Sequence, residues 1–421
     1  MKLAVLHGGI PSLGHSGSTI AAWTIVEQLV NAGHEVRVIA LPAPELYDDT
    51  VPARFAALER LTGDLRVIEI PPAREARHGR WRRRAGFART LARPRDDELF
   101  PAIRAQAAVA DALKGIDAGI AFAFEAAAAT AGVETPLLAV LSHPPGVPRR
   151  LRLRYAPGVR TGWSPASLSA RASELSYLAY ADRRAAAILR TFPRVGVFSE
   201  HHAEWARRRG VNAFYAHYPM PDLAGPDWRQ RRAAAAHDGP PRLLMIGHLR
   251  GIGTLSGLPL FAEEILPRLT AELGPDGFEV HLVGDHDPPD EFAEALRHPA
   301  VRLRGRIDEP DDEFLSADVL LAPNPTTTGA SARILSGLTF ANCIVAHTDS
   351  LVGIPELADG ENSLLGADGP SLADATVRAL RDPDLRERLG VEARALYERA
   401  FRPEVAAARL VQEVERLART G

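Results

Sequence analysis

The chain has 421 residues, of which 46% are apolar and 24% are charged. This balance is typical of a soluble globular protein with two or three domains and excludes a mainly disordered chain. The single cysteine, Cys343, excludes an internal disulfide and a cysteine-based zinc site. No apolar run is long enough for a membrane span, and the first residues lack the pattern of a signal peptide. We therefore expect a cytoplasmic protein.

The net charge of −3 hides an asymmetry between the two halves of the chain. Residues 1–221 carry 29 basic and 20 acidic side chains, whereas residues 222–421 carry 21 and 33. A basic half suits an anionic ligand. The stretch Arg74–Arg95 has nine arginines and one glutamate, and we interpret it as a solvated loop, with an acceptor contact or a peripheral membrane contact as alternatives. No basic stretch is interleaved with aromatic residues along a predicted strand or helix, so nucleic acid is not an expected partner.

Strand-like apolar runs alternate with helix-length segments, a pattern typical of βα units on parallel sheets. In the first half the predicted strands are Leu3–His7, Glu35–Leu41, Arg66–Ile70, Ala118–Phe124, Pro136–Leu141 and Gly196–Ser199, with a crossover helix at Thr19–Ala32. In the second half they are Arg242–Ile246, Phe278–Val283, Val301–Leu303, Val319–Ala322 and Cys343–Ala346, with later helices at Ser371–Leu380 and Pro383–Tyr397.

The two series of strands predict two domains. A segment rich in Pro, Gly and Ala separates them, and we interpret residues 222–241 as a linker. The predicted fold class is α/β, with Rossmann-like doubly wound domains at residues 1–221 and 242–402 that face a cleft. The amphipathic segment 403–421 is expected to pack back on the first domain as a helix.

Glycines and hydroxyl residues follow the first strand, between His7 and Ser18. Gly9 allows the backbone to approach a ligand closely, while Gly17 and Ser18 lie where a helix would offer free N–H groups to an anion. The spacing is not that of a dinucleotide-binding fingerprint, and no acidic residue ends the second strand, which disfavours a nicotinamide dehydrogenase. We name these three residues as candidate donor-binding residues, with a purely structural turn as the alternative.

The most informative stretch lies in the second half. It runs GASARILSGLTFANCIVA from Gly329 to Ala346 and continues with GIPEL at Gly353–Leu357 and DGENSLL at Asp359–Leu365. This stretch resembles the donor-binding domain of the glycosyltransferase family 4 enzymes, and the likeness extends over most of residues 195–402. The resemblance implies the GT-B fold, with the acceptor on the first domain and a nucleotide diphosphate sugar on the second. It also implies that no metal or other cofactor is required.

The charge distribution expected at the start of the helix after Gly329 suits binding of the donor diphosphate. A turn that opens a helix directs N–H groups and the helix dipole at an anion, and the residues expected there are Gly329, Ala330 and Ser331. Arg333, one turn into the helix, would neutralise the leaving diphosphate. Arg250, after the first strand of the second domain, is a second candidate, although the lysine that the family has beside it is missing. By resemblance, the loop that begins at Ile307 borders the nucleotide base.

Two positions depart from the family pattern. The family carries two glutamates eight positions apart, and the second contacts the ribose hydroxyls. Here the two positions are Thr328 and Ser336. Neither side chain is a carboxylate acceptor for a diol, so the pattern of the family does not decide between GDP and UDP. Both residues stay in the candidate donor site.

Candidate catalytic residues also occur in the first half. His143 follows a predicted strand, and the resemblance places a histidine at this point near the donor sugar and the acceptor. Glu125, at the end of the preceding strand, is a further candidate. The neighbouring pair His201 and His202 has no third ligand at a metal-binding spacing, and we interpret it as a surface pair.

These residues lead to a functional hypothesis. We predict a retaining glycosyltransferase that moves a sugar from a UDP- or GDP-linked donor to an acceptor, with Arg333, His143 and Glu125 as the catalytic candidates. The resemblance implies this retention and a front-face route in which the departing phosphate accepts the proton of the acceptor, so a pair of carboxylates is not needed as it is in a glycosidase. We expect a small molecule of a bacterial specialised-metabolite pathway as acceptor, with a glycan as alternative. A nucleotide-sugar epimerase of the same fold and a non-catalytic sugar-nucleotide-binding protein remain the alternative functions.

Overall fold

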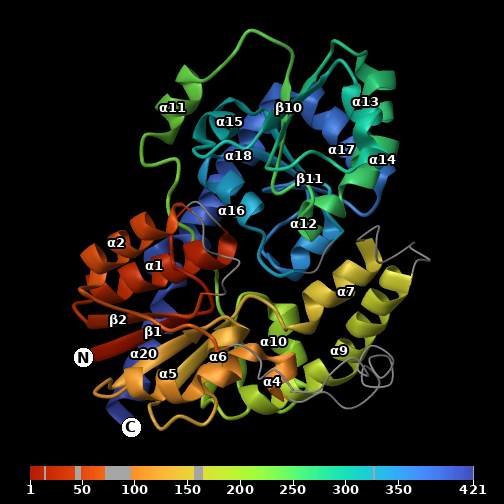
Figure 1. The fold of residues 1–421 in the computed structure, drawn as a ribbon. Coiled ribbons are helices and arrows are strands. Elements are labelled where there is room, and N and C mark those ends of the chain that lie inside the picture. The colour runs from red at the N-terminus through yellow and green to blue at the C-terminus, as the bar shows by residue number, and fades with distance from the viewer. Residues whose placement is uncertain (14–15, 43–48, 72–95, 156–164, 326–327, 421) are drawn as a thin grey trace. The chain divides into compact units, whose positions relative to one another are not determined.

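The computed structural model describes residues 1–13, 16–42, 49–71, 96–155, 165–325 and 328–420. The chain forms two compact α/β units (Figure 1). Unit 1 comprises residues 1–219 and 406–421, and unit 2 comprises residues 220–405. No helix in the described ranges has both the length and the apolar character that a membrane crossing requires. The arginine-rich stretch Arg74–Arg95 lies outside the described residues.

Unit 1 is built on a parallel sheet of seven strands in the order β3-β2-β1-β4-β5-β6-β7. The strands are β1 (Lys2–His7), β2 (Glu35–Ala40), β3 (Asp64–Val67), β4 (Ala118–Phe122), β5 (Leu137–Leu141), β6 (Arg194–Val197) and β7 (Ala213–Tyr215). Leu3 pairs with Val36 on one side and with Ala118 on the other. The direction of strand addition therefore reverses between β1 and β4, and this is the switch point at which such sheets bind ligands.

Helices cover the sheet of unit 1 (Figure 1). The described helices of unit 1 are α1 (Gly17–Asn31), α2 (Val51–Thr62), α4 (Asp96–Leu99), α5 (Gln106–Ala112), α6 (Phe124–Thr130), α7 (Gly146–Tyr155), α9 (Pro165–Leu189), α10 (Glu200–Arg207) and α20 (Ala408–Thr420). Helix α7 packs on α9 and not on the sheet. Helix α1 begins with a capping box between Ser16 and Thr19. The C-terminal helix α20 contacts β4 and β5 and buries Leu410, Val414 and Leu417. The chain thus returns to its first sheet at its end.

Unit 2 contains a second parallel sheet, of six strands in the order β10-β9-β8-β11-β12-β13. The strands are β8 (Arg242–Ile246), β9 (Glu279–Val283), β10 (Val301–Gly305), β11 (Val319–Ala322), β12 (Cys343–His347) and β13 (Leu364–Gly366). The helices are α11 (Trp228–Ala234), α12 (Ile252–Leu255), α13 (Leu266–Leu273), α14 (Asp290–Ala293), α15 (Asp311–Ser316), α16 (Ala332–Thr339), α17 (Gly369–Arg381), α18 (Pro383–Leu396) and α19 (Pro403–Ala406). Here the switch point lies between β8 and β11.

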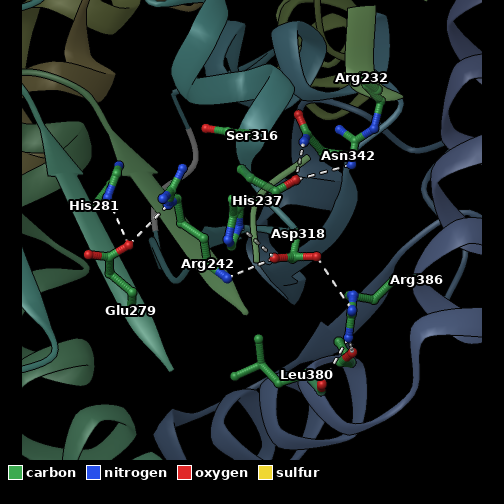
Figure 2. Close-up of polar contacts among 12 residues, drawn as sticks. Arg232, His237, Arg242, Glu279, His281, Ser316, Asp318, Asn342, Leu380 and Arg386 are labelled. Atoms are coloured by element: carbon green, nitrogen blue, oxygen red, sulfur yellow. Dashed lines mark hydrogen bonds and ion pairs between the residues drawn. The ribbon is translucent and has the colours of Figure 1, made fainter. Parts of the chain in front are cut away.

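Residues 222–241, which the sequence analysis treats as a linker, are fastened to unit 2. They contain α11, and Arg231 forms an ion pair with Asp311 at 2.9 Å. Arg232 donates hydrogen bonds to the carbonyl groups of Phe314, Ala317 and Phe340. Figure 2 shows Asp318 in contact with His237, Arg242 and Arg386. These contacts explain why the segment is part of unit 2.

Candidate functional site

The candidate site of unit 2 is built around Arg333, the second residue of α16. Its Nη1 donates a hydrogen bond to Oδ1 of Asn324 at 3.0 Å, and its Nη2 donates one to Oγ1 of Thr254 at 3.0 Å. Asn324 follows β11, and Thr254 lies in α12, which follows β8. The guanidinium therefore lies at the switch point of the sheet, at the carboxyl ends of its strands.

The charge of Arg333 is not compensated by an acidic side chain. Both of its partners are neutral, and no carboxylate of the described ranges lies within ion-pair distance of the guanidinium. Burial lowers its pKa to about 10, so the group stays protonated at neutral pH. The two bonds use two of the five N–H donors of a guanidinium. A partly buried cation with donors to spare attracts an anion, and phosphate oxygens suit its planar geometry.

Close backbone packing fixes this arginine. Gly247, directly after β8, has a φ of +144°, and a Cβ at this position would lie 2.8 Å from Nη2 of Arg333 and 2.6 Å from Oγ1 of Thr254. Asn324 donates its side-chain N–H groups to the carbonyls of Gly253 and Thr254. The sequence analysis missed all of these supporting residues. A polar residue two positions after the end of a buried strand, as Asn324 is, was the available signal.

The turn before α16 has the predicted form. Gly329 adopts a φ of +98°, and Ser331 occupies the N-cap position without a side-chain cap hydrogen bond. Gly353 packs directly on this turn, because a Cβ there would lie 2.0 Å from the carbonyl oxygen of Gly329 and 2.6 Å from the backbone N of Ala330. Thr328 precedes the turn and is half-buried. The first N–H groups of α16 thus lie beside Arg333, and the side chain of Ser331 does not accept a hydrogen bond from them.

The remaining candidates of unit 2 lie further from Arg333 along the fold. Ser336 is one helical turn beyond it and only 9% exposed. The next residue, Gly337, faces the sheet, where a Cβ would lie 2.3 Å from Cδ2 of Leu320.

Arg250 is exposed in the loop after β8, and its Nε donates to the carbonyl of Asp287 at 3.0 Å. Ile307 is half-buried after the edge strand β10. Arg250 and Ile307 therefore share the sheet edge with Arg333 but not its hydrogen-bond cluster.

In unit 1, Glu125 and Gly9 lie at the corresponding switch point. β1 ends at His7 and β4 ends at Phe122, and Glu125 is exposed in the first turn of α6. A Cβ on Gly8 would lie 2.9 Å from Cβ of Glu125, so the glycine turn and α6 are in close contact. The backbone N–H of Gly9 donates to Nδ1 of His7 at 3.0 Å. Burial lowers the pKa of His7 to about 4, and its imidazole is therefore neutral at physiological pH.

His143 lies in the loop between β5 and α7 and is half-buried. Burial lowers its pKa, although a hydrogen bond with the carbonyl of Pro144 and the charge of Glu125 act in the opposite direction. His202 on α10 is close enough to interact electrostatically with His143, and burial lowers the pKa of His202 to about 3. The surface interpretation of the His201 and His202 pair is wrong for His202, which is 3% exposed because α10 packs this face on the sheet. His201 is exposed.

Gly17 and Ser18 form the predicted start of α1, where nearby side chains form hydrogen bonds with backbone groups. The side chain of Ser16 accepts a hydrogen bond from the backbone N–H of Thr19. The hydroxyl of Tyr218 donates to the carbonyl of Gly17. The capping box engages the N–H groups of Ser16 and Thr19, not those of Gly17 and Ser18, so the donor-binding role of Gly17 and Ser18 stays a prediction.

A cavity of about 820 Å³ in unit 2 lies at the amino ends of its strands, opposite the Arg333 edge. Its charged side chains neutralise one another: Glu279 pairs with Arg242 at 3.2 Å, and Glu313 pairs with Arg304 at 2.9 Å and with His281 at 2.5 Å. Figure 2 shows the part of this network formed by Arg242, Glu279 and His281. Because these charges are paired, we assign the cavity a structural role.

Comparisons with known proteins agree on the same architecture. Residues 240–382 match the family model described as Glycosyl transferases group 1. Among solved structures, sucrose-phosphate synthase from Thermosynechococcus elongatus is 16% identical over 100% of both chains, with a TM-score of 0.66. Anabaena HepE in complex with UDP is 14% identical over 99% of both chains, with a TM-score of 0.64. WaaG, a glycosyltransferase involved in lipopolysaccharide biosynthesis, is 15% identical over 98% of this chain and 99% of its own, with a TM-score of 0.61. Curated protein sequences give no match.

Proposed function

We propose that the chain, which has the GT-B fold and matches the glycosyl transferases group 1 model over residues 240–382, is a glycosyltransferase that transfers a sugar from a UDP-linked donor with retention of anomeric configuration. The uncompensated charge of Arg333 carries this proposal. It lies at the switch point of the second sheet, beside the uncapped start of α16. An anion that carries two phosphates fits a guanidinium and a helix N-terminus together.

The chemical role of Arg333 follows from where charge develops. When the glycosidic bond breaks, negative charge grows on the departing diphosphate, and a fixed cation stabilises it in the transition state. A phosphate oxygen then accepts the proton of the acceptor on the same face of the sugar. No metal is needed for this step if Arg333 and the N–H groups of α16 neutralise the diphosphate.

For the nucleotide we favour UDP because HepE, a protein of similar fold, has been crystallised with UDP and with UDP-glucose. For the acceptor we propose a small molecule, bound by unit 1 near His143 and Glu125. The departures at Thr328 and Ser336 favour a specialised donor and acceptor over the common ones of the family. The basic excess of residues 1–221 suits an acceptor that carries negative charge.

Titration calorimetry with UDP and GDP tests the nucleotide, and turnover of labelled UDP-glucose tests the reaction. We expect UDP to bind and the label to appear on an acceptor from a panel of small molecules. In a thermal-shift measurement, UDP at about 100 times its Kd should stabilise the chain by about 2.7 kcal/mol. Isomerisation of the donor would instead identify an epimerase, and UDP binding without any turnover would identify a non-catalytic binding protein.

The Ser336→Glu variant tests how the ribose is held. Ser336 is 9% exposed, so a glutamate there would lose hydration, and its carboxylate, one helical turn from Arg333, would compete with the donor diphosphate for that guanidinium. We expect UDP affinity measured by calorimetry to fall about tenfold or more, which corresponds to about 1.4 kcal/mol. Ser336→Ala, which removes the hydroxyl without adding charge, is the matched control and should retain affinity. Tighter UDP binding by Ser336→Glu with transfer retained would show that the pose of the family is kept.

A further inference from the structure

A second group of polar side chains lies on the loops that follow β8 and β9, at the same sheet edge as Arg333. His248 follows β8, while Asp285 and His286 follow β9. One potential ligand atom from each of the three residues lies within 4.8 Å of the other two. Two imidazoles and a carboxylate are the donor set of many transition-metal sites with open coordination positions.

The distances within this group fit a shared cation better than direct hydrogen bonds. Nδ1 of His248 lies 3.6 Å from Oδ1 of Asp285, and Nδ1 of His286 lies 3.3 Å from Oδ2 of the same carboxylate. Hydrogen bonds of this kind are normally 2.7–3.2 Å long. Two ligands on a tetrahedral Zn²⁺ with bonds of about 2.0–2.1 Å are separated by about 3.4 Å. Each N···O distance, one to either oxygen of Asp285, is therefore close to the separation of two ligands on one metal ion.

The two loops are held together independently of any ion. Nε of Arg250 donates to the carbonyl of Asp287 at 3.0 Å, and the backbone N of Leu249 donates to the carbonyl of Asp285 at 3.4 Å. The rings of His248 and His286 stack, with centroids 4.6 Å apart and planes at 8°, so one ring must rotate out of the stack before both imidazoles ligate the same ion in their ring planes. The backbone N of Arg250 donates to Nδ1 of His248 at 3.1 Å, so ligation through this atom replaces one hydrogen bond.

The surrounding charge favours a cation. The loop after β9 and the first turn of α14 contribute Asp287, Asp290 and Glu291 in addition to Asp285. Arg250 is the basic residue on the facing loop, and its Nε is already engaged by a carbonyl. All three candidate ligands are exposed or partly exposed, so an ion from solvent reaches them without opening the fold.

We propose that His248, Asp285 and His286 bind a divalent transition-metal ion such as Zn²⁺. Imidazole and carboxylate ligands together favour Zn²⁺, Co²⁺ or Ni²⁺ over Mg²⁺ and Ca²⁺, which prefer oxygen ligands alone. Three protein ligands leave at least one position for water or for a phosphate oxygen of the donor. The phosphate contact rests on the proposed function, whereas the metal site itself does not.

Calorimetric titration of the untagged full chain with Zn²⁺ tests the site. We expect one Zn²⁺ per chain, and an affinity at least tenfold weaker in each of His248→Asn, Asp285→Asn and His286→Asn. His201→Asn is the matched control, because His201 is also exposed but has no third ligand beside it. Thermal melting without metal should be the same for all four variants, which separates loss of ligation from loss of folding.

The visible absorption of bound Co²⁺ provides a second measurement, since it reports nitrogen ligation directly and should vanish in the His248→Asn, His286→Asn double variant. Absence of saturable Zn²⁺ binding, or binding that the double variant leaves unchanged, would overturn the site. A UDP titration with and without Zn²⁺ tests the phosphate contact, and equal affinities would refute that contact. Failure of UDP to bind under both conditions would refute the proposed function and leave the Zn²⁺ result standing.

Discussion

Replacing Arg333 with alanine is expected to reduce the rate of sugar transfer by about 100-fold or more at saturating donor. Removal of one preorganised charge stabiliser costs a factor of this size in enzymes that develop an oxyanion. Arg333 meets only the neutral acceptors Asn324 and Thr254, so in the described structure no other role for its charge competes with diphosphate binding. Turnover of labelled UDP-glucose measures the loss of transfer rate, and calorimetry with UDP measures the loss of nucleotide affinity.

Arg378→Ala is the matched control for this variant. Arg378 is exposed in the last turn of α17, on the same unit, and its loss should leave turnover unchanged. For the native chain, UDP affinity should fall as the pH rises toward the Arg333 pKa of about 10, because the bound anion requires the protonated guanidinium. Full turnover by Arg333→Ala at saturating donor would contradict the assignment of the donor site.

Replacing Gly353 with alanine is expected to produce the second large effect. The new Cβ would lie 2.0 Å from the carbonyl oxygen of Gly329 and 2.6 Å from the backbone N of Ala330. Backbone atoms do not move aside as a flexible side chain does, so the turn before α16 must shift. We expect a loss of about 1–3 kcal/mol in the free energy of unfolding, typical of overpacking, and a UDP affinity at least tenfold lower.

Gly239→Ala is the control for Gly353→Ala. Gly239 is exposed, and an added Cβ would make only an ordinary contact, at 3.4 Å from Nδ1 of His237. Chemical denaturation measures the stability of both variants, and calorimetry measures their UDP affinity. If Gly353→Ala kept native stability and native UDP affinity, the tight packing between Gly353 and the Gly329 turn would have no part in positioning the donor.

Much of unit 2 could be predicted because its signals are local. The strand Val319–Ala322 is predicted and observed with the same bounds, since an apolar run of this length between polar residues is typical of a buried parallel strand. The helix start after Gly329 was also predictable, because the glycine supplies the positive φ that the turn requires. β7 and β13, three residues each, were not predicted, because such short runs give little periodic signal. The long helix α9 was missed as well.

The candidate site was only partly predictable. Arg333 stood out through its family motif, but its partner Thr254 is 79 positions away in the sequence. Contacts between residues so far apart in the sequence form when parallel strands bring their carboxyl ends to one edge of the sheet. The same applies to His248 and Asp285, which meet only because β8 and β9 are neighbours in the sheet. The burial of His202 depends on how α10 packs and is not encoded in its neighbours in the sequence.

The sequence alone therefore determined the class of the fold and the resemblance of its second half to the group 1 glycosyl transferases, because alternating apolar segments and a contiguous motif are properties of the chain order. It also determined which arginine to examine, since Arg333 lies in the first turn of a helix that follows a glycine turn. Only the tertiary structure decided that this arginine has no acidic partner within the described residues and lies at the switch point. The physical reason is that charge compensation and burial depend on groups far apart in the chain, and only folding brings those groups into contact.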